Sequence, residues 1–118
     1  MSDAPHIFPK SEKLCGKTTI ARVMKQGHWF STAILRVCFL KEEQGPNRIL
    51  TSVPKRYFKR AVKRNLLKRR IREAYRLNKE LLPEEGYLVM LVYTGTEVAD
   101  YNSIEAEVKA VLKKLACR

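Results

Sequence analysis

The residues best suited to chemistry in this sequence are arginines and an asparagine that recur at helical spacing. They are Asn65, Arg69, Arg72 and Arg76, with Lys68 at the edge of the same row. At 100° per residue these positions share one face of a helix. A guanidinium group matches phosphate oxygens, and an asparagine amide can donate to a phosphate or a 2′-hydroxyl, or help hold a hydrated metal ion. The row therefore indicates a surface that binds a polyanion.

The charge of the whole molecule is concentrated around this row. Residues 55–79 contain twelve lysines and arginines and one acid, Glu73, so they carry +11 of the net charge of +12. Like charges at i,i+4 on a helix repel by a few tenths of a kcal/mol each, so an ordinary surface helix mixes both signs. We therefore expect an external polyanion to offset the repulsion. Nucleic acid is the first choice, and an anionic membrane surface is the second.

Length and composition place this surface on one globular domain. The 118 residues are enough for a single core, and the hydrophobic content of 45% excludes a wholly disordered chain. No apolar stretch approaches the roughly 18 residues of a membrane-spanning helix, so we expect a soluble protein without a membrane partner. Residues 1–12 are interpreted as a flexible arm, and residues 13–118 as the single binding domain.

The cysteines argue against a metal site. Cys15, Cys38 and Cys117 are widely spaced, and only His6 and His28 could complete a ligand set, so no zinc site is expected. The N-terminus has no secretion signal, which predicts reduced thiols and a cytoplasmic location. No obligate protein partner is evident from the sequence.

The first half of the chain is predicted to contain a short helix and two strands. Thr18 or Thr19 can cap the helix, which Gly27 would end in the left-handed conformation. Residues 29–40 are rich in β-favouring types and alternate, which predicts one strand with one buried face. After a turn, residues 48–53 are predicted to return as an antiparallel strand.

The second half is predicted to contain a long helix, a strand and a last helix. The long helix should run from about residue 58 or 60 to residue 78, and it should bury Leu67, Ile71, Ala74 and Tyr75. Residues 87–92 are almost wholly apolar, as in an interior strand. The last helix should begin at a capping box of Asn102 and Glu105, and its apolar residues Ile104, Val108, Val111, Leu112 and Leu115 keep helical spacing. This order predicts a small sheet covered by helices, in which the long helix acts as a crossover. Such a crossover is right-handed by default.

The basic segment resembles the protein component of bacterial ribonuclease P. The resemblance is carried by Val53-Pro54-Lys55-Arg56, Lys59-Arg60-Ala61-Val62, Arg64-Asn65, Lys68-Arg69, Arg72-Glu73 and Tyr75-Arg76-Leu77. It extends in pattern over residues 13–116, including the short helix before Gly27 and the Leu82-Pro83 break. The resemblance implies an α+β two-layer sandwich with a small mixed sheet and a left-handed βαβ crossover, contrary to the default.

The resemblance also implies a function and its residues. The chain would be the protein subunit of the endoribonuclease that removes the 5′ leader of precursor tRNA, while the RNA subunit performs the hydrolysis with magnesium. The implied RNA-binding residues are Lys55, Arg56, Arg60, Arg64, Asn65, Lys68, Arg69, Arg72 and Arg76. The implied leader cleft contains Ile20 and Met24, with Arg36, Cys38 and Tyr93 added by position alone.

This chain departs from the family pattern at two places. Leu66 stands where the motif usually has a second arginine, so one cation is missing. Ile20 and Met24 stand where aromatics often line the leader cleft, which removes base stacking worth about 1–3 kcal/mol per base. Trp29 and Phe30 fit either hairpin packing or an exposed RNA surface, whereas Tyr57 is interpreted as a packing residue.

Other functions fit the sequence less well. A structural ribosomal-RNA-binding protein would show the same basic helix without processing activity, and it is the main alternative. A self-contained nuclease would need carboxylates clustered around a metal ion, whereas most acids here fall in predicted arms and loops. A DNA-binding regulator would need a helix-turn-helix pair, which a single basic helix between strands does not provide.

Overall fold

The structure, a computed structural model, describes residues 17–42, 46–82 and 86–117. The predicted arm at residues 1–12 lies outside these ranges. The elements in chain order are helix α1 (Lys17–Gln26), strands β1 (His28–Ser31), β2 (Leu35–Lys41) and β3 (Arg48–Ser52), helix α2 (Ala61–Asn78), the 3-10 turn η3 (Lys79–Leu81), strand β4 (Tyr87–Tyr93) and helix α3 (Tyr101–Ala116).

The strands form one four-stranded mixed sheet in the order β1-β2-β4-β3. Strand β2 pairs antiparallel with both β1 and β4, whereas β3 pairs parallel with β4. Strand β4 therefore lies inside the sheet, and every residue of it except Val92 is buried. This confirms the prediction of an interior strand from its unbroken apolar sequence.

Two strand predictions were wrong. The run 29–40 is divided into β1 and β2 by a turn, in which the Thr32 amide donates to the Leu35 carbonyl at 2.8 Å. Strand β3 does not return against β2, because β4 lies between them. The strand that is apolar on both faces needs two neighbours and two covering layers, so it takes the interior position and leaves β3 at the edge.

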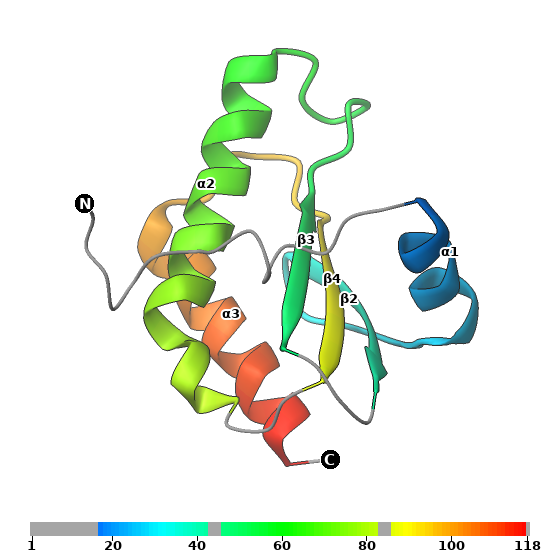
Figure 1. The fold of residues 1–118 in the computed structure, drawn as a ribbon. Coiled ribbons are helices and arrows are strands. Elements are labelled where there is room, and N and C mark those ends of the chain that lie inside the picture. Colours follow the sequence, from blue (N-terminus) through cyan, green and yellow to red (C-terminus); the bar gives the residue numbers. More distant parts are fainter. Residues whose placement is uncertain (1–16, 43–45, 83–85, 118) are drawn as a thin grey trace, which may run out of the picture.

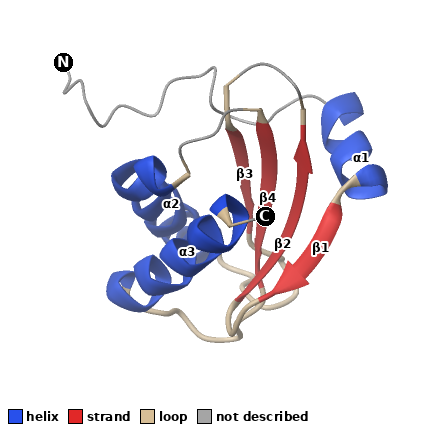
Figure 2. Ribbon diagram, turned by 90° about the horizontal axis from the view of Figure 1, so that it is seen from below, coloured by secondary structure: helices blue, strands red, loops and turns tan. Residues whose placement is uncertain are grey.

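Helices cover the two faces of the sheet unequally, as Figures 1 and 2 show. Helices α2 and α3 lie side by side on one face and enclose the larger core cluster. The four residues predicted to form the core stripe of α2, Leu67, Ile71, Ala74 and Tyr75, are all buried in this cluster, as are the five predicted for α3. Helix α1 covers part of the other face, over a smaller cluster of Val23, Cys38, Leu88 and Met90.

Gly27 is needed for close packing and not for a left-handed turn. Among the described residues only Gly86 has a positive φ, of 94°. A Cβ atom on Gly27 would lie 2.4 Å from the Val23 carbonyl oxygen and 2.7 Å from that of Phe39. The predicted left-handed stop was therefore wrong, although glycine is required at this position because α1 ends directly against β2. Helix α1 already includes Thr18 and Thr19, so neither is its cap.

The cap of α3 also differs from the prediction. The Asp100 carboxylate accepts a hydrogen bond from the Ser103 amide at 3.1 Å, so Asp100 and not Asn102 is the N-cap. A cap residue must precede the helix and accept from an amide two or three positions later, and Asp100 meets both conditions. Hydrogen bonding by the Ser103 side chain and amide lowers the pKa of the Asp100 carboxyl.

These elements confirm an α+β fold with a small mixed sheet. The β3-α2-β4 unit is the predicted crossover, since β3 and β4 are parallel neighbours. Its left-handed sense stays a prediction. None of the helices in the described ranges is long and apolar enough to cross a membrane.

Candidate nucleic-acid interface

Helix α2 holds the predicted cationic row on a rigid support. Its apolar stripe faces the sheet and α3, so the opposite side of the helix is directed away from the core. Asn65 and Arg69 are exposed on that side, and Lys68, Arg72 and Arg76 are half-buried along its margin. The structure thus brings these five predicted residues onto one outward-facing surface.

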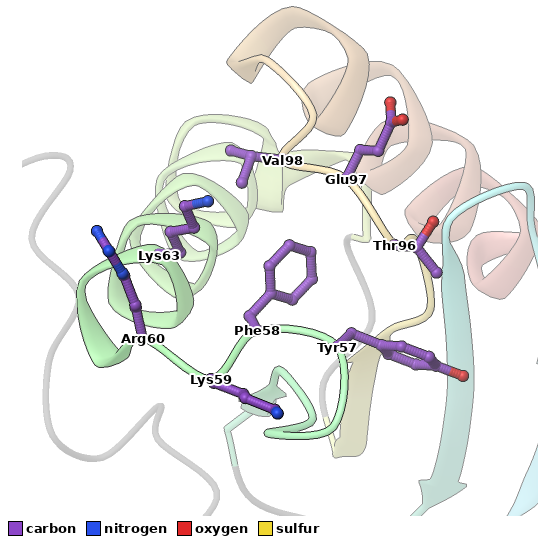
Figure 3. Close-up of a pocket in the computed structure, with 8 residues that line it drawn as sticks. All are labelled: Tyr57, Phe58, Lys59, Arg60, Lys63, Thr96, Glu97 and Val98. Carbon is purple, nitrogen blue, oxygen red and sulfur yellow. The ribbon is translucent and has the colours of Figure 1, made fainter.

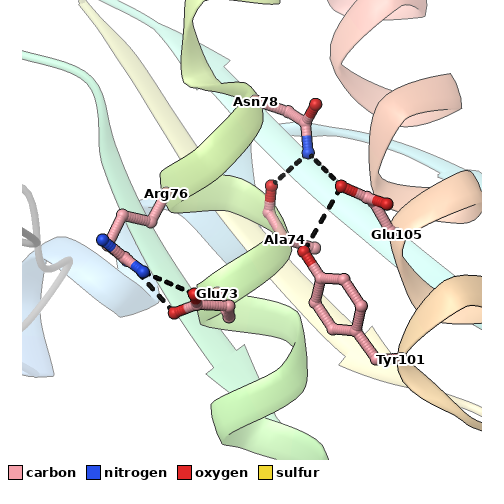
Figure 4. Close-up of polar contacts among 6 residues, drawn as sticks. All are labelled: Glu73, Ala74, Arg76, Asn78, Tyr101 and Glu105. Atoms are coloured by element: carbon pink, nitrogen blue, oxygen red, sulfur yellow. Dashed lines mark hydrogen bonds and ion pairs between the residues drawn. The ribbon is translucent and has the colours of Figure 1, made fainter. Parts of the chain in front are cut away.

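Two polar contacts link this helix to the rest of the molecule. The Arg70 guanidinium donates to the Ala99 carbonyl at 2.5 Å. The Asn78 amide donates to the Glu105 carboxylate of α3 at 3.1 Å, and within α2 it also donates to the Ala74 carbonyl at 2.8 Å. The Tyr101 hydroxyl donates to the same Glu105 oxygen at 3.3 Å (Figure 4). Helix α2 is therefore tied to α3 by polar contacts as well as by the core.

The loop that leads into α2 displays further cations. Val53 and Phe58 are buried, and the Phe58 ring centroid lies 5.9 Å from that of Tyr93. These anchors leave Lys55, Arg56 and Arg60 exposed, as the prediction of binding residues requires. The Arg56 guanidinium lies 5.1 Å from the centroid of the Tyr57 ring, and Tyr57 is 40% exposed. Tyr57 is therefore a surface residue, contrary to its interpretation as a packing residue.

Two arginines of the predicted set have partners within the protein. The Arg64 guanidinium donates to the carbonyls of Phe58 at 2.7 Å and Lys59 at 2.9 Å, so it holds the entry loop against the first turn of α2. Arg76 pairs with Glu73, with its Nε atom 3.1 Å from the carboxylate (Figure 4). Among the described residues, no ion pair joins an acid to the cations of the entry loop or of the N-terminal part of α2.

A cavity of about 460 Å³ opens beside this region, where the start of α2 meets the loop between β4 and α3. It is lined by Tyr57, Phe58, Lys59, Arg60, Lys63, Thr96, Glu97 and Val98. Figure 3 shows the Phe58 ring pointing toward the loop of residues 96–98, while Arg60 and Lys63 extend from the start of α2. Lys59 and Lys63 extend the cationic surface beyond the predicted residues. The sequence could have indicated both lysines, because they belong to the run of residues 55–79 in which cations far outnumber acids.

The residues predicted for the leader cleft do not form one site. Ile20 is half-buried against the smaller cluster, and Met24 is 50% exposed on α1. Arg36 is exposed on β2, with its guanidinium 4.4 Å from the centroid of the Trp29 ring. These three residues lie on α1 or on the sheet face that α1 partly covers.

Cys38 and Tyr93 are corrections to the predicted cleft. Cys38 has no exposed surface, and its thiol donates to the Val23 carbonyl at 3.1 Å. Burial raises the pKa of this thiol. Tyr93 is 1% exposed on the opposite face of the sheet, where its hydroxyl donates to the Glu97 carbonyl at 2.6 Å. Both side chains are almost fully buried, because α1 covers one and the main core encloses the other.

The described residues contain no group of three or more His, Cys, Asp or Glu side chains that could hold a metal ion. The exposed guanidinium and ammonium groups of this surface can bind and neutralise phosphates. The fold and the surface together define a small basic α+β protein with its cations displayed on one helix and on the loop that leads into it.

Comparison with known proteins gives this class its family. The sequence matches the family described as Ribonuclease P over residues 8–116. The ribonuclease P protein component of Porphyromonas gingivalis is 34% identical over 124 residues, which cover 98% of this chain and 90% of that protein. That of Dictyoglomus thermophilum is 36% identical over 95 residues, covering 80% of this chain and 78% of its own length. The chain belongs to the family of ribonuclease P protein components.

Solved structures show the same fold. The ribonuclease P protein of Staphylococcus aureus matches with a TM-score of 0.77 at 23% identity, covering 89% of this chain and 95% of that one. The protein from Thermotoga maritima also matches with a TM-score of 0.77 at 23% identity, over 87% of this chain and 96% of that one. These likenesses support the α+β fold of the sheet and its three helices.

Proposed function

We propose that this chain serves ribonuclease P by binding the enzyme's catalytic RNA through the outer surface of α2 and its entry loop. Ribonuclease P is an endoribonuclease ribonucleoprotein that matures tRNA 5′ ends, and its RNA subunit is catalytic. The observation that carries the proposal is the +11 charge of residues 55–79, most of it on the entry loop and on helix α2, whose other side is fixed in the core. An RNA backbone supplies the regularly spaced phosphates that such a row can neutralise.

The individual residues divide this work. Arg60, Asn65 and Arg69 are exposed and supply donors directly to RNA phosphates or 2′-hydroxyls. Arg64 keeps the entry loop in place through its two carbonyl contacts, so it positions its neighbours. Lys55 and Arg56 extend the surface toward the end of β3. Leu66 is half-buried, so this chain contacts the RNA without a cation at that position.

The second part of the proposal concerns precursor tRNA. We propose that the 5′ leader crosses the sheet face that carries α1, which is the face where Ile20, Met24 and Arg36 lie. The half-buried Ile20 and the exposed Met24 offer apolar surface to a base. In a cytoplasmic enzyme, leader and catalytic RNA would then lie on two neighbouring surfaces of one small protein.

Magnesium belongs to the RNA in this proposal. The described carboxylates do not gather into a set that fits the ion. The protein's own residues instead neutralise phosphates where the catalytic RNA and the leader approach each other. They thereby lower the concentration of magnesium needed to hold the two RNAs together.

The test is reconstitution of 5′ processing with a catalytic ribonuclease P RNA. At a few millimolar magnesium the protein should accelerate removal of the leader, and at high magnesium and salt its effect should shrink. The triple variant Arg60→Ala, Asn65→Ala, Arg69→Ala should lose the acceleration, while the activity of the RNA alone at high magnesium is unchanged. Arg64 is kept in this variant, because it supports the entry loop.

A matched control removes the same charge elsewhere. Lys109→Ala with Lys113→Ala takes two cations from α3, and this variant should accelerate processing as the wild type does. Equal loss in both variants would contradict an interface on α2. Cleavage by protein freed of RNA would point to a self-contained nuclease. RNA binding without any acceleration by the wild type would point to a structural RNA-binding role.

A further inference from the structure

The cavity beside the start of α2 has two walls that come from distant parts of the chain (Figure 3). The entry loop supplies one wall through Tyr57 and Phe58, and the loop of residues 96–98 supplies the other. Tyr57 is 40% exposed and Val98 is 37% exposed, so each wall offers apolar surface to a ligand. The volume of about 460 Å³ is within the range of small-molecule pockets, roughly 300–1,000 Å³.

Tyr93 supports both walls from inside the core. Its ring centroid lies 5.9 Å from that of Phe58 in the entry loop. Its hydroxyl donates to the Glu97 carbonyl at 2.6 Å and accepts from the Ala99 amide at 3.2 Å. Arg70 of α2 donates to the Ala99 carbonyl and so holds the same loop a second time. The two walls are therefore fixed in advance, which lowers the cost of ordering them when a ligand binds.

Cations line the cavity beside these apolar walls. Lys59, Arg60 and Lys63 are all exposed there. Within the described part of the chain, no acid forms an ion pair with any of the three. Arg60 is also the N-cap residue of α2, where it makes no side-chain capping hydrogen bond, and the first turn contains no acid. Cations are unfavourable at this positive end of a helix, so a bound anion would relieve the repulsion.

These features together fit a nucleotide. The face of a nucleobase is flat and can pack against an aromatic ring, while a phosphate matches guanidinium and ammonium groups. Arg60 belongs both to the cavity and to the outer surface of α2 and its entry loop, which the proposed function assigns to the catalytic RNA. A nucleotide in the cavity is therefore continuous with RNA bound along α2.

We propose that this cavity binds one unpaired nucleotide of the catalytic RNA, with its base against Tyr57 and Val98 and its phosphate on Arg60 and Lys63. The inference rests on the proposed function. Bases within an RNA helix are paired and stacked, so only an unpaired nucleotide can place its base in the cavity. Phosphates are alike along an RNA, so the cavity determines which part of the RNA the cations of α2 bind.

The salt dependence of affinity for the catalytic RNA separates the base from the phosphate. Tyr57→Ala should weaken binding by about 5- to 100-fold and leave the slope of log K against log salt unchanged, because a stacked base releases no counterions. Tyr57→Phe should restore the affinity. Lys63→Ala should instead reduce the slope by about one unit. A reduced slope for Tyr57→Ala would mean that the ring only orients Arg56, 5.1 Å from its centroid, and would overturn the inference.

A second pair of variants tests the support of the walls. Tyr93→Phe keeps the ring beside Phe58 but removes the hydroxyl that holds the loop of residues 96–98. We expect a lower affinity for the catalytic RNA with an unchanged salt slope. Tyr101→Phe is the matched control, because it also removes one hydroxyl hydrogen bond, to Glu105, and Tyr101 does not line the cavity. It should bind the RNA as the wild type does, and equal losses in the two variants would overturn the inference.

Crosslinking identifies the occupant. A photo-crosslinking phenylalanine analogue at position 57 of the full-length protein should attach to one unpaired nucleotide of the catalytic RNA. Attachment to precursor tRNA alone, or to paired nucleotides, would overturn the inference, as would wild-type affinity of Tyr57→Ala. In each case, acceleration of processing by the wild type at low magnesium would still support the proposed function. A wild type that gives no acceleration would instead reject the proposed function.

Discussion

The two faces of the sheet are built differently. One face is closed by two helices that are hydrogen-bonded to each other. Four aromatic side chains of the strands belong to this face: three are buried in its core, and the fourth is partly buried against it. The other face is covered by the ten-residue helix α1, and its cluster has four buried members. Leu50 and Val92 on this face are only half-buried. The closed face supplies the larger share of stability, since the hydrophobic contribution follows the apolar area removed from water.

The difference teaches where this small protein can bind a ligand. A closed face keeps α2 fixed, so the cations on its outer side hold their spacing. An incompletely covered face leaves side chains such as Trp29 and Arg36 within reach of a ligand. The closed face thus supplies stability and supports the cations of α2, whereas the other face of the four-stranded sheet leaves side chains accessible.

The largest effect should follow from a cavity in the closed face. Ile71→Ala removes a side chain with no exposed surface from the stripe of α2, and we expect a loss of about 2–5 kcal/mol in the free energy of unfolding. Arg69→Ala, two residues away on the exposed side, should change it by no more than about 0.5 kcal/mol. Urea denaturation measures both. Similar losses in the two variants would mean that the faces of α2 are assigned wrongly.

A smaller effect should follow from crowding the junction of α1 with the sheet. Gly27→Ala places a Cβ atom against two backbone carbonyls that cannot move independently, so α1 must shift. We expect a loss of about 1–3 kcal/mol together with a change in Trp29 emission, because β1 follows the junction directly. The exposed neighbour Gln26→Ala is the control and should behave as the wild type. Wild-type stability of Gly27→Ala would contradict the close approach of α1 to β2.

The smallest effect concerns the rates at which two thiols of the same molecule react, one of them exposed and the other buried under α1. In a Cys15→Ser background, a thiol reagent should label the exposed Cys117 at once and the buried Cys38 slowly. Burial raises the pKa of the Cys38 thiol, so little of the reactive thiolate forms. If the face under α1 opens locally, Cys38 should become reactive at urea concentrations below the global transition. Labelling that coincides with global unfolding would show that the two faces unfold together.

The sequence predicted the helices better than the sheet. Leu67, Ile71 and Ala74 could be assigned to the core because helical periodicity is local, and the structure confirms them. The position of β3 depends on which strand lies beside it, and residues close in sequence do not determine that. The turn between β1 and β2 contains no glycine, proline or asparagine from Thr32 to Ile34. The sequence therefore lacks the residues that usually indicate a turn, and the run 29–40 could not be divided into two strands.

The part of the candidate site that depends on composition, namely its exposed cations, could be predicted from the sequence. Excess charge identified the cations of α2, and exposure of Arg60 and Arg69 agrees with it. Composition could not show that Arg64 holds carbonyls of its own chain. It also could not show that Cys38 and Tyr93 point to opposite faces and are both buried, because their burial depends on which helix covers each face.

The interior position of β4 has a consequence for synthesis of the protein. Strands β2 and β3 have their shared neighbour only once residues 87–93 are available. Until then the β1–β2 hairpin is the part of this sheet that can pair, and isolated hairpins are marginally stable in water. The cationic helix is therefore made before the sheet that supports it is complete. On the ribosome, its apolar stripe must wait for β4 and α3 to emerge before it can be buried.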